Sequence, residues 1–174
     1  MIAISYWRSY GVPVIITNTM NAFGEMQQPN KYPAIVQRKV MRGEKVTIHG
    51  SAKAIGSRYY IHARNFADAL LFILRNTRPH LHQEGTVDRP DRYNIVGERR
   101  IDNLELAQLI ADMLGLPLHY ELQDFRDARP GHDQHYGLAG NKLGEMGWKA
   151  PVPFEESMRK TVEWSRRHPE WLEP

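Results

Sequence analysis

The chain has 174 residues, enough for one compact domain or for one domain with part of another. It contains no cysteine, no secretory segment and no long apolar run. This composition excludes disulfides, thiolate metal sites and membrane spans, and predicts a soluble cytoplasmic protein. The formal charge of +3 comes from Lys and Arg residues scattered among Asp and Glu, a pattern that disfavours a nucleic-acid interface and favours local anion sites.

The N-terminal residues predict a helix followed by a buried strand. Residues 1–10 have the pattern of the last turns of an amphipathic helix, ended by Gly11 and Pro13, but no capping residue precedes them. We therefore expect that part of this helix lies upstream of the chain. The apolar run at residues 14–17 predicts a strand buried in a sheet.

A polar loop at residues 21–31 follows that strand. In open α/β sheets, ligands bind at loops that follow the C-terminal ends of parallel strands. Asn21, Gln27 and Lys31 offer two amides and one cation, which suit an anionic small molecule rich in hydroxyl groups. The loop alone is a weak signal, because most strand-to-helix connections are only connections.

The next segments alternate between helix and strand. Apolar spacing and turn residues predict, in order, a helix at 34–42, a strand at 46–49, a small-residue loop at 50–57, a strand at 58–62 and a helix from Asn65 to about Arg75. The core stripe of this last helix is predicted to be Phe66, Ala69, Leu70, Ile73 and Leu74. Residues 76–91 are polar, contain two prolines and predict a surface loop.

The second half of the chain continues the alternation. The pattern predicts a strand at 93–96, a helix from a capping box at Asp102–Glu105 to Gly115, a short strand at 118–120, an irregular segment at 126–135, a short helix at 141–146 and a final helix that opens at Pro153. Strands that alternate with helices indicate the α/β class.

Metal binding and nucleophilic catalysis are both disfavoured by the sequence. The pairs His80/His82 and His132/His135 lack further ligands at zinc spacing. The chain also has no cysteine and no Gly-x-Ser-x-Gly elbow.

Two arginines near loops are candidates for anion binding. Arg58 opens a strand after a loop rich in small residues, and Arg129 precedes Pro-Gly in an irregular segment. A guanidinium group suits the bidentate geometry of phosphate oxygens, although an arginine in such a position, taken alone, is more often a surface salt-bridge partner. His49, at a strand end, could stack on a base or be a half-exposed strand residue.

The order of the motifs carries a family resemblance over the whole chain. The motifs are Asn21-Ala22-Phe23-Gly24-Glu25-Met26-Gln27, the strand 43–50, Ser57-Arg58-Tyr59-Tyr60-Ile61-His62 with Ala67-Asp68-Ala69, Tyr93-Asn94-Ile95, Asn103 with Glu105, Arg129-Pro130-Gly131-His132-Asp133, Gly147-Trp148, and Phe154-Glu155 to Trp164. This series resembles the nucleotide-sugar epimerases and dehydratases of the extended short-chain dehydrogenase/reductase superfamily. The Arg-Pro-Gly-His-Asp element is most similar to dTDP-glucose 4,6-dehydratases and UDP-glucuronate decarboxylases.

The resemblance implies which part of that fold is present. It implies the C-terminal part of an extended, Rossmann-type α/β fold, with a few strands of the parallel sheet and the small mixed α/β substrate-binding domain. Residues 1–20 would end the Rossmann-type portion, and residues 21–174 would form the nucleotide-sugar-binding domain, with residues 92–97 returning to the sheet.

The resemblance also implies what the chain lacks. The N-terminal half of the family carries the Gly-x-x-Gly-x-x-Gly turn for NAD and the Tyr-x-x-x-Lys pair, and neither motif occurs here. We therefore expect a substrate-binding half without catalytic residues and without a cofactor of its own, although the intact family uses NAD. A split enzyme with a separate NAD-binding half, and a binding module without turnover, remain alternatives.

The family roles transfer to individual residues as follows. Asn21 and Lys31 would hold the diphosphate and sugar, Thr47 and His49 would border the nucleobase, Arg58 and Arg129 would clamp phosphates, and Asn94 would contact the nucleotide. The ligand would be a UDP- or dTDP-linked sugar. The resemblance does not choose between uracil and thymine, name the sugar, or choose between epimerase, dehydratase and decarboxylase.

Three departures from the family pattern lead to further expectations. Glu25 replaces a proline, which would loosen the loop and add an anion near the diphosphate. Asn65 replaces an aspartate, and the loop at 50–57 is longer by about two residues than in the dehydratases.

Without the other half of the fold, the strands at 14–17 and 93–96 would be left open. We therefore expect a homo-oligomer, most simply a two-fold dimer.

Overall fold

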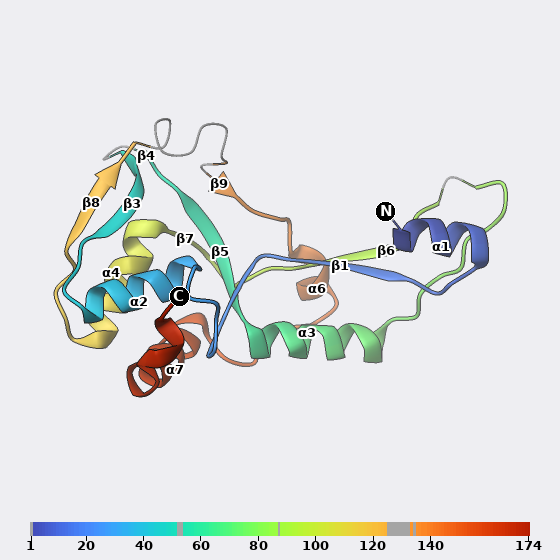
Figure 1. The fold of residues 1–174 in the computed structure, drawn as a ribbon. Helices are drawn as coiled ribbons and strands as arrows, with labels where there is room; N and C mark the ends of the chain where they lie inside the picture. Colours follow the sequence, from blue (N-terminus) through green and yellow to red (C-terminus); the bar gives the residue numbers. More distant parts are fainter. Residues whose placement is uncertain (1, 52–53, 87, 125–132, 134) are drawn as a thin grey trace.

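The molecule has two lobes, and the chain runs between them several times (Figure 1). The computed structural model describes residues 2–51, 54–86, 88–124, 133 and 135–174. Strand β5 (Ser57–His62) runs between the lobes, from the end that holds helices α2, α4 and α7 to the end that holds α3 and the β1–β6 pair (Figure 1). The mixed sheets and parallel pairings confirm the expected α/β class.

One lobe is built on a parallel pair of strands. Strand β1 (Ile15–Thr19) pairs with β6 (Asp91–Ile95), with Ile15 opposite Asp91 and Thr19 opposite Ile95. Helices α3 (Ala63–Asn76) and α6 (Asn141–Glu145) contribute to the core of this lobe, which is formed by Ile61, Ala69, Ile73, Tyr93, Ile95 and Leu143. Residues 91–95 therefore lie parallel to residues 15–19.

The start and core stripe of α3 differ from the sequence-based prediction. His62 is the N-cap, because its Nδ1 accepts a hydrogen bond from the backbone N–H of Arg64 at 3.1 Å. Asn65 is instead buried inside the first turns, where its Nδ2 donates to the carbonyl oxygen of Val152 at 2.7 Å. The predicted cap at Asn65 was therefore wrong. The core stripe ends at Ile73, since Leu74 is 72% exposed.

The other lobe packs three helices against short strands. Helices α2 (Tyr32–Met41), α4 (Asn103–Leu114) and α7 (Phe154–Arg167) contribute to one core with β3 (Val46–Ser51). Strand β8 (Tyr120–Gln123) lies parallel to β3. The largest buried side chains of this core include Val36, Ile48, Ile101, Leu106, Ile110 and Met158. The turn η1 (Pro169–Leu172) then covers α2 and α7.

Several short strands were not predicted from the sequence. Strand β2 (Asn21–Phe23) is parallel to β5, β7 (Arg100–Asp102) is antiparallel to it, and β9 (His135–Tyr136) also pairs with it. Strand β4 (Ala54–Ile55) pairs with the end of β3, so the stretch predicted as a loop at 50–57 contains a small hairpin.

The ends of α4 confirm the local signals in the sequence. Oδ1 of Asp102 accepts a hydrogen bond from the backbone N–H of Glu105 at 2.8 Å, which satisfies one of the free donors at the helix start. Gly115 ends the helix at φ 68°, a left-handed conformation that glycine adopts without steric cost.

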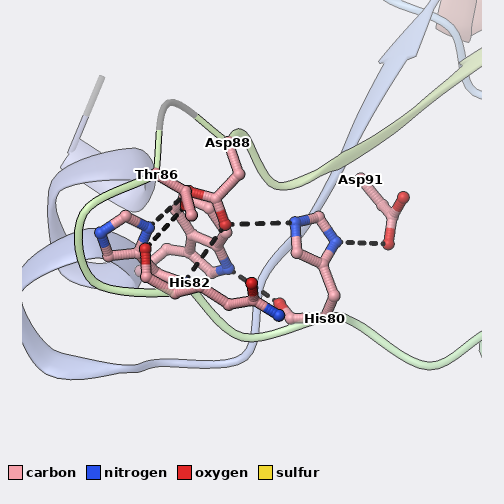
Figure 2. Close-up of polar contacts among 7 residues, drawn as sticks. His80, His82, Thr86, Asp88 and Asp91 are labelled. Carbon is pink, nitrogen blue, oxygen red and sulfur yellow. Dashed lines mark hydrogen bonds and ion pairs between the residues drawn. The ribbon is translucent and has the colours of Figure 1, made fainter.

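Helix α1 (Ile2–Tyr10) is attached through Trp7, its one buried described residue. The Trp7 indole packs against the rings of His80 and His82, at centroid distances of 5.3 and 5.0 Å, and donates to the carbonyl oxygen of His80 at 2.9 Å. Figure 2 shows His82 directed at Asp88, and His80 between Asp88 and Asp91. These contacts connect α1 to the polar segment before β6.

In the described part of the chain, no helix is long and apolar enough to cross a membrane. No group of three or more His, Asp or Glu side chains among the described residues is arranged to hold a metal ion, and this includes the cluster around His80.

Candidate functional site

A cavity of about 560 Å³ lies where β2, β3 and β5 meet the start of α2. It is lined by Asn21, Ala22, Gln27, Asn30, Lys31, Tyr32, Pro33, Ile35, Lys39, Thr47, His49, Arg58, Tyr60 and Asn103. A volume of several hundred cubic ångströms is within the usual range for small-molecule sites. We call residues 24–31, which connect β2 to α2 and contribute Gln27, Asn30 and Lys31 to this lining, the cavity loop.

The strands contribute side chains in alternating positions. Thr47 and His49 are two residues apart on β3, and Arg58 and Tyr60 are two residues apart on β5. Since alternate residues of a strand point to the same face, each strand presents a pair of polar side chains to the cavity. The strand period therefore explains why Tyr60 joins Arg58 in the site.

The start of α2 also lines the cavity. Lys31 is the N-cap residue, Tyr32 and Pro33 begin the helix, and no acidic residue lies in its first turn. The N-terminus of a helix carries partial positive charge and attracts anions. The cavity lining therefore includes both a helix N-terminus and Arg58.

The charge of the lining favours an anionic ligand. Lys31, Lys39 and Arg58 are cationic, and none of the lining residues in the described part of the chain is acidic. Lys39 donates to the carbonyl oxygen of Lys45 at 2.9 Å, and a carbonyl partner leaves the ammonium charge in place. Phosphate groups are the common biological anions that suit such a set of Lys, Arg and helix N-terminus.

Hydrogen bonds to the backbone fix the orientation of Arg58. Its Nη1 donates to the carbonyl oxygen of Ser57 at 2.7 Å, and its Nη2 donates to that of Asp133 at 2.6 Å. Next to it, Oγ of Ser57 lies 2.8 Å from Nδ1 of His135 on β9. The two hydrogen bonds to backbone carbonyls orient the guanidinium group of Arg58.

Two tyrosines, the buried Tyr60 and the partly buried Tyr32, complete the site as neutral hydrogen-bonding groups. Burial raises the pKa of Tyr60 to about 12, an effect that the nearby charge of Arg58 partly offsets. Burial, followed by the neighbouring Tyr60 and Asp102, raises the pKa of Tyr32 well above its ordinary value. The Tyr32 hydroxyl donates to the carbonyl oxygen of Asn103 at 2.8 Å. Both phenols therefore remain protonated at neutral pH and contribute polarity rather than negative charge.

The structure gathers most of the residues selected from the sequence. Asn21, Lys31, Thr47, His49 and Arg58 all line the cavity. Asn94 does not, because it lies on β6, where it accepts from Nδ2 of Asn18 at 3.0 Å and donates to the carbonyl oxygen of Ala139 at 2.9 Å. Arg129 lies outside the described residues, so its role stays a prediction.

The expected effect of Glu25 is corrected by the structure. Glu25 is not part of the cavity lining, and its carboxylate accepts a hydrogen bond from Arg64 instead of adding a free anion to the site.

Tyr32, Lys39, Tyr60 and Asn103 were missed by sequence reasoning. Of these four, only Tyr60 could have been predicted from local sequence, because it lies two positions after Arg58 on one strand and so shares its face.

Comparison with protein families identifies a clear relationship. The family model described as "NAD dependent epimerase/dehydratase family" matches residues 1–95, more than half of the chain. The chain is also 30% identical over 178 residues to a probable dTDP-glucose 4,6-dehydratase of Sinorhizobium fredii, which covers 99% of the chain and 47% of that protein.

A plant enzyme and a solved structure extend the comparison. A trifunctional UDP-glucose 4,6-dehydratase/UDP-4-keto-6-deoxy-D-glucose 3,5-epimerase/UDP-4-keto-L-rhamnose-reductase of Arabidopsis thaliana is 32% identical over 171 residues, which are 98% of this chain and 24% of that protein. The dTDP-glucose 4,6-dehydratase DesIV of Streptomyces venezuelae, solved with NAD and TYD bound, superposes with a TM-score of 0.81 at 27% identity, over 99% of this chain and 50% of that one. The chain thus spans between a quarter and a half of these relatives.

Proposed function

The chain belongs to the NAD-dependent epimerase/dehydratase family, and from that premise we propose that it is the nucleotide-sugar-binding half of such an enzyme. The observation that carries this proposal is the cavity of about 560 Å³, whose described lining combines Lys31, Lys39 and Arg58 with no acidic residue. The ligand we propose is a UDP- or dTDP-linked sugar, in keeping with the UDP- and dTDP-sugar enzymes among the relatives.

Each wall of the cavity would bind one part of the ligand. The diphosphate would lie between Arg58 and the N-terminus of α2 with Lys31, because these groups supply the positive charge. The amides of Asn21 and Gln27 would bind sugar hydroxyl groups. Thr47 and His49 would border the base.

The described residues do not fit a site for NAD. A pyrophosphate-binding turn connects a parallel strand directly to a helix through glycines. In the two-stranded sheet β1 leads to β2 and β6 leads to β7, so neither of these strands ends in such a turn. Strand β5 and its parallel partners β2 and β9 do lead to helices, but none of these connections has the Gly-x-x-Gly-x-x-Gly spacing. We therefore assign recognition of the sugar nucleotide to this chain, and no redox step.

A split enzyme is the second candidate. Within the described residues β1 pairs only with β6, so its other edge is open to a strand of another chain. A separate NAD-binding half, which would supply the part of the relatives that this chain does not span, is a partner of suitable size. Turnover of a nucleotide sugar that requires both chains together would support this candidate over a binding module without turnover.

Calorimetry with UDP and dTDP tests the proposed function. We expect Arg58→Ala to weaken binding of either diphosphate by about 1.5–3 kcal/mol, the usual range for a hydrogen bond to a charged group. Uridine and thymidine, which lack phosphate, should bind both proteins alike. Arg75→Ala makes the same charge change on an exposed residue of α3 and should have no effect. Equal losses for nucleoside and diphosphate would refute the role of Arg58, and no binding of either diphosphate by the wild type would refute the proposed function.

A further inference from the structure

The cavity loop contains a strained residue. Met26 adopts φ 60°, the one positive value among the described residues other than glycine, and its side chain is 60% exposed. A left-handed conformation is unfavourable for a residue with a Cβ atom, and an exposed side chain gains little packing that could offset it. The surrounding structure must therefore hold the loop in this shape.

Glu25, the residue next to Met26, makes the contacts that can do this. Its Oε1 accepts a hydrogen bond from Nη2 of Arg64 at 2.8 Å, and its Oε2 lies 3.2 Å from Nε2 of His62. The Glu25 side chain is 19% exposed and that of His62 is 4% exposed, whereas Arg64 covers the pair from the solvent side at 67% exposure. The carboxylate thus connects the cavity loop to the start of α3.

The hydrogen bond to Nδ1 defines the tautomer of the neutral His62 ring. Because Nδ1 accepts from the backbone N–H of Arg64, the proton of the neutral ring is on Nε2, the nitrogen that faces Glu25. Nε2 is buried and makes no well-aligned hydrogen bond among the described residues, so its short approach to Glu25 is mainly electrostatic. Burial lowers the pKa of His62, although the Glu25 carboxylate acts in the opposite direction and Arg64 and Lys160 act with burial.

The His62 ring cannot move away from Glu25 without disturbing its neighbours. The edge of the ring packs against Phe23, with centroids 5.2 Å apart, and a Cβ atom placed on Gly24 would lie 3.3 Å from Nε2. The backbone of the cavity loop therefore approaches a fixed ring at the residue that precedes Glu25.

We propose that Glu25 is a positioning residue for the cavity, and that its contacts with Arg64 and His62 form a latch that holds the cavity loop in the binding conformation. The latch presents Gln27, Asn30 and Lys31 to the ligand, and it fixes a loop that contains a strained residue. The effect on ligand affinity rests on the proposed function, whereas the effect on the loop itself does not.

The first test measures the loop without any ligand. Hydrogen exchange of the Lys31 amide, which donates to the carbonyl oxygen of Gln28 at 3.1 Å, should become about tenfold faster or more in Glu25→Gln and in Arg64→Ala, because each variant breaks the ion pair. Arg64→Lys keeps the cation and should restore most of the protection. Glu145→Gln and Arg75→Ala make the same charge changes at exposed residues of α6 and α3 and should exchange like the wild type.

The second test measures affinity for UDP and dTDP by calorimetry. If the binding conformation falls from nearly full to a minor population, the apparent Kd rises by the inverse of that fraction, so we expect binding about three- to tenfold weaker in Glu25→Gln and Arg64→Ala. Since both residues belong to one latch, the double variant should lose little more than either single variant.

The outcomes separate the latch from the proposed function. Unchanged exchange of the Lys31 amide in both single variants would overturn the latch, and so would fully additive losses of affinity. If the wild type binds neither diphosphate, the proposed function fails and the exchange measurements alone decide whether the latch exists.

Discussion

The attachment of helix α1 gives a prediction whose size follows from the structure. Trp7 is 0% exposed, while Ile2, Tyr6 and Tyr10 on the same helix are 77%, 54% and 75% exposed. The indole is covered by the rings of His80 and His82 and donates one hydrogen bond to a backbone carbonyl. Trp7→Ala should therefore remove most of the free energy that holds α1 against the rest of the molecule.

The magnitude has two contributions. A buried tryptophan removes about 150–250 Å² from water, worth roughly 4–6 kcal/mol at about 25 cal/mol per Å², and measured Trp→Ala losses are about 3–5 kcal/mol. The hydrogen bond to His80 adds about 1 kcal/mol. The free energy lost in Trp7→Ala cannot exceed the free energy with which α1 docks, so we expect a loss of about 3–5 kcal/mol for this variant. Trp7→Phe, which keeps an aromatic ring but loses the N–H donor, should cost about 1–2 kcal/mol.

Urea unfolding followed by circular dichroism measures the change in the free energy of unfolding. Chymotrypsin cleavage after Tyr6 and Tyr10 measures the release of α1. Ile2→Ala is the matched control, since this exposed side chain should change stability by less than about 0.5 kcal/mol. If Trp7→Ala stays within about 0.5 kcal/mol of the wild type and resists cleavage equally, Trp7 is not the anchor of the helix.

Three further predictions concern pH, cofactor and assembly. Because burial lowers the pKa of His62 in the folded state, the unfolded chain binds more protons as the pH falls through about 6.5, and the free energy of unfolding should decrease there. His62→Asn keeps a capping side chain without a titrating ring and should weaken this dependence in urea titrations at several pH values; an identical dependence would exclude His62 as its source. The purified chain should show no micromolar NAD binding by calorimetry, since no described parallel strand leads into a pyrophosphate-binding turn, and a clear NAD isotherm would contradict this. Light scattering should show an oligomer, most simply a dimer. Among the described residues, one edge of β1 is unpaired, and Leu74 on α3 and three large side chains of α1 are exposed. A stable monomer would show that these surfaces need no partner.

Local signals were sufficient to predict the long elements. Helix α4 follows from an Asp102 cap, a 3.6-residue apolar repeat and a terminal Gly115, all of which lie within one segment. Helix α7 likewise has acidic residues in its first turn and basic residues in its last turn. The sequence also identified the α/β class, and the order of its motifs indicated the family, which the comparisons confirm. The division of the chain at residue 20 stays a prediction.

Contacts between segments distant in sequence determined the short strands and the composition of the cavity. Strands β2, β7 and β9 have two or three residues each and exist because β5 supplies their hydrogen-bonding partners, which no local pattern reveals. The same holds for the site: Tyr32 and Asn103 are 71 residues apart in sequence and meet only in the folded chain. Glu25 suggested a loosened loop from its position alone, whereas the tertiary structure places its carboxylate against Arg64 and His62. Local sequence therefore determined which chemical groups the chain carries and which helices it forms, while folding determined which of those groups face the cavity, because their distances depend on how the strands pair around β5.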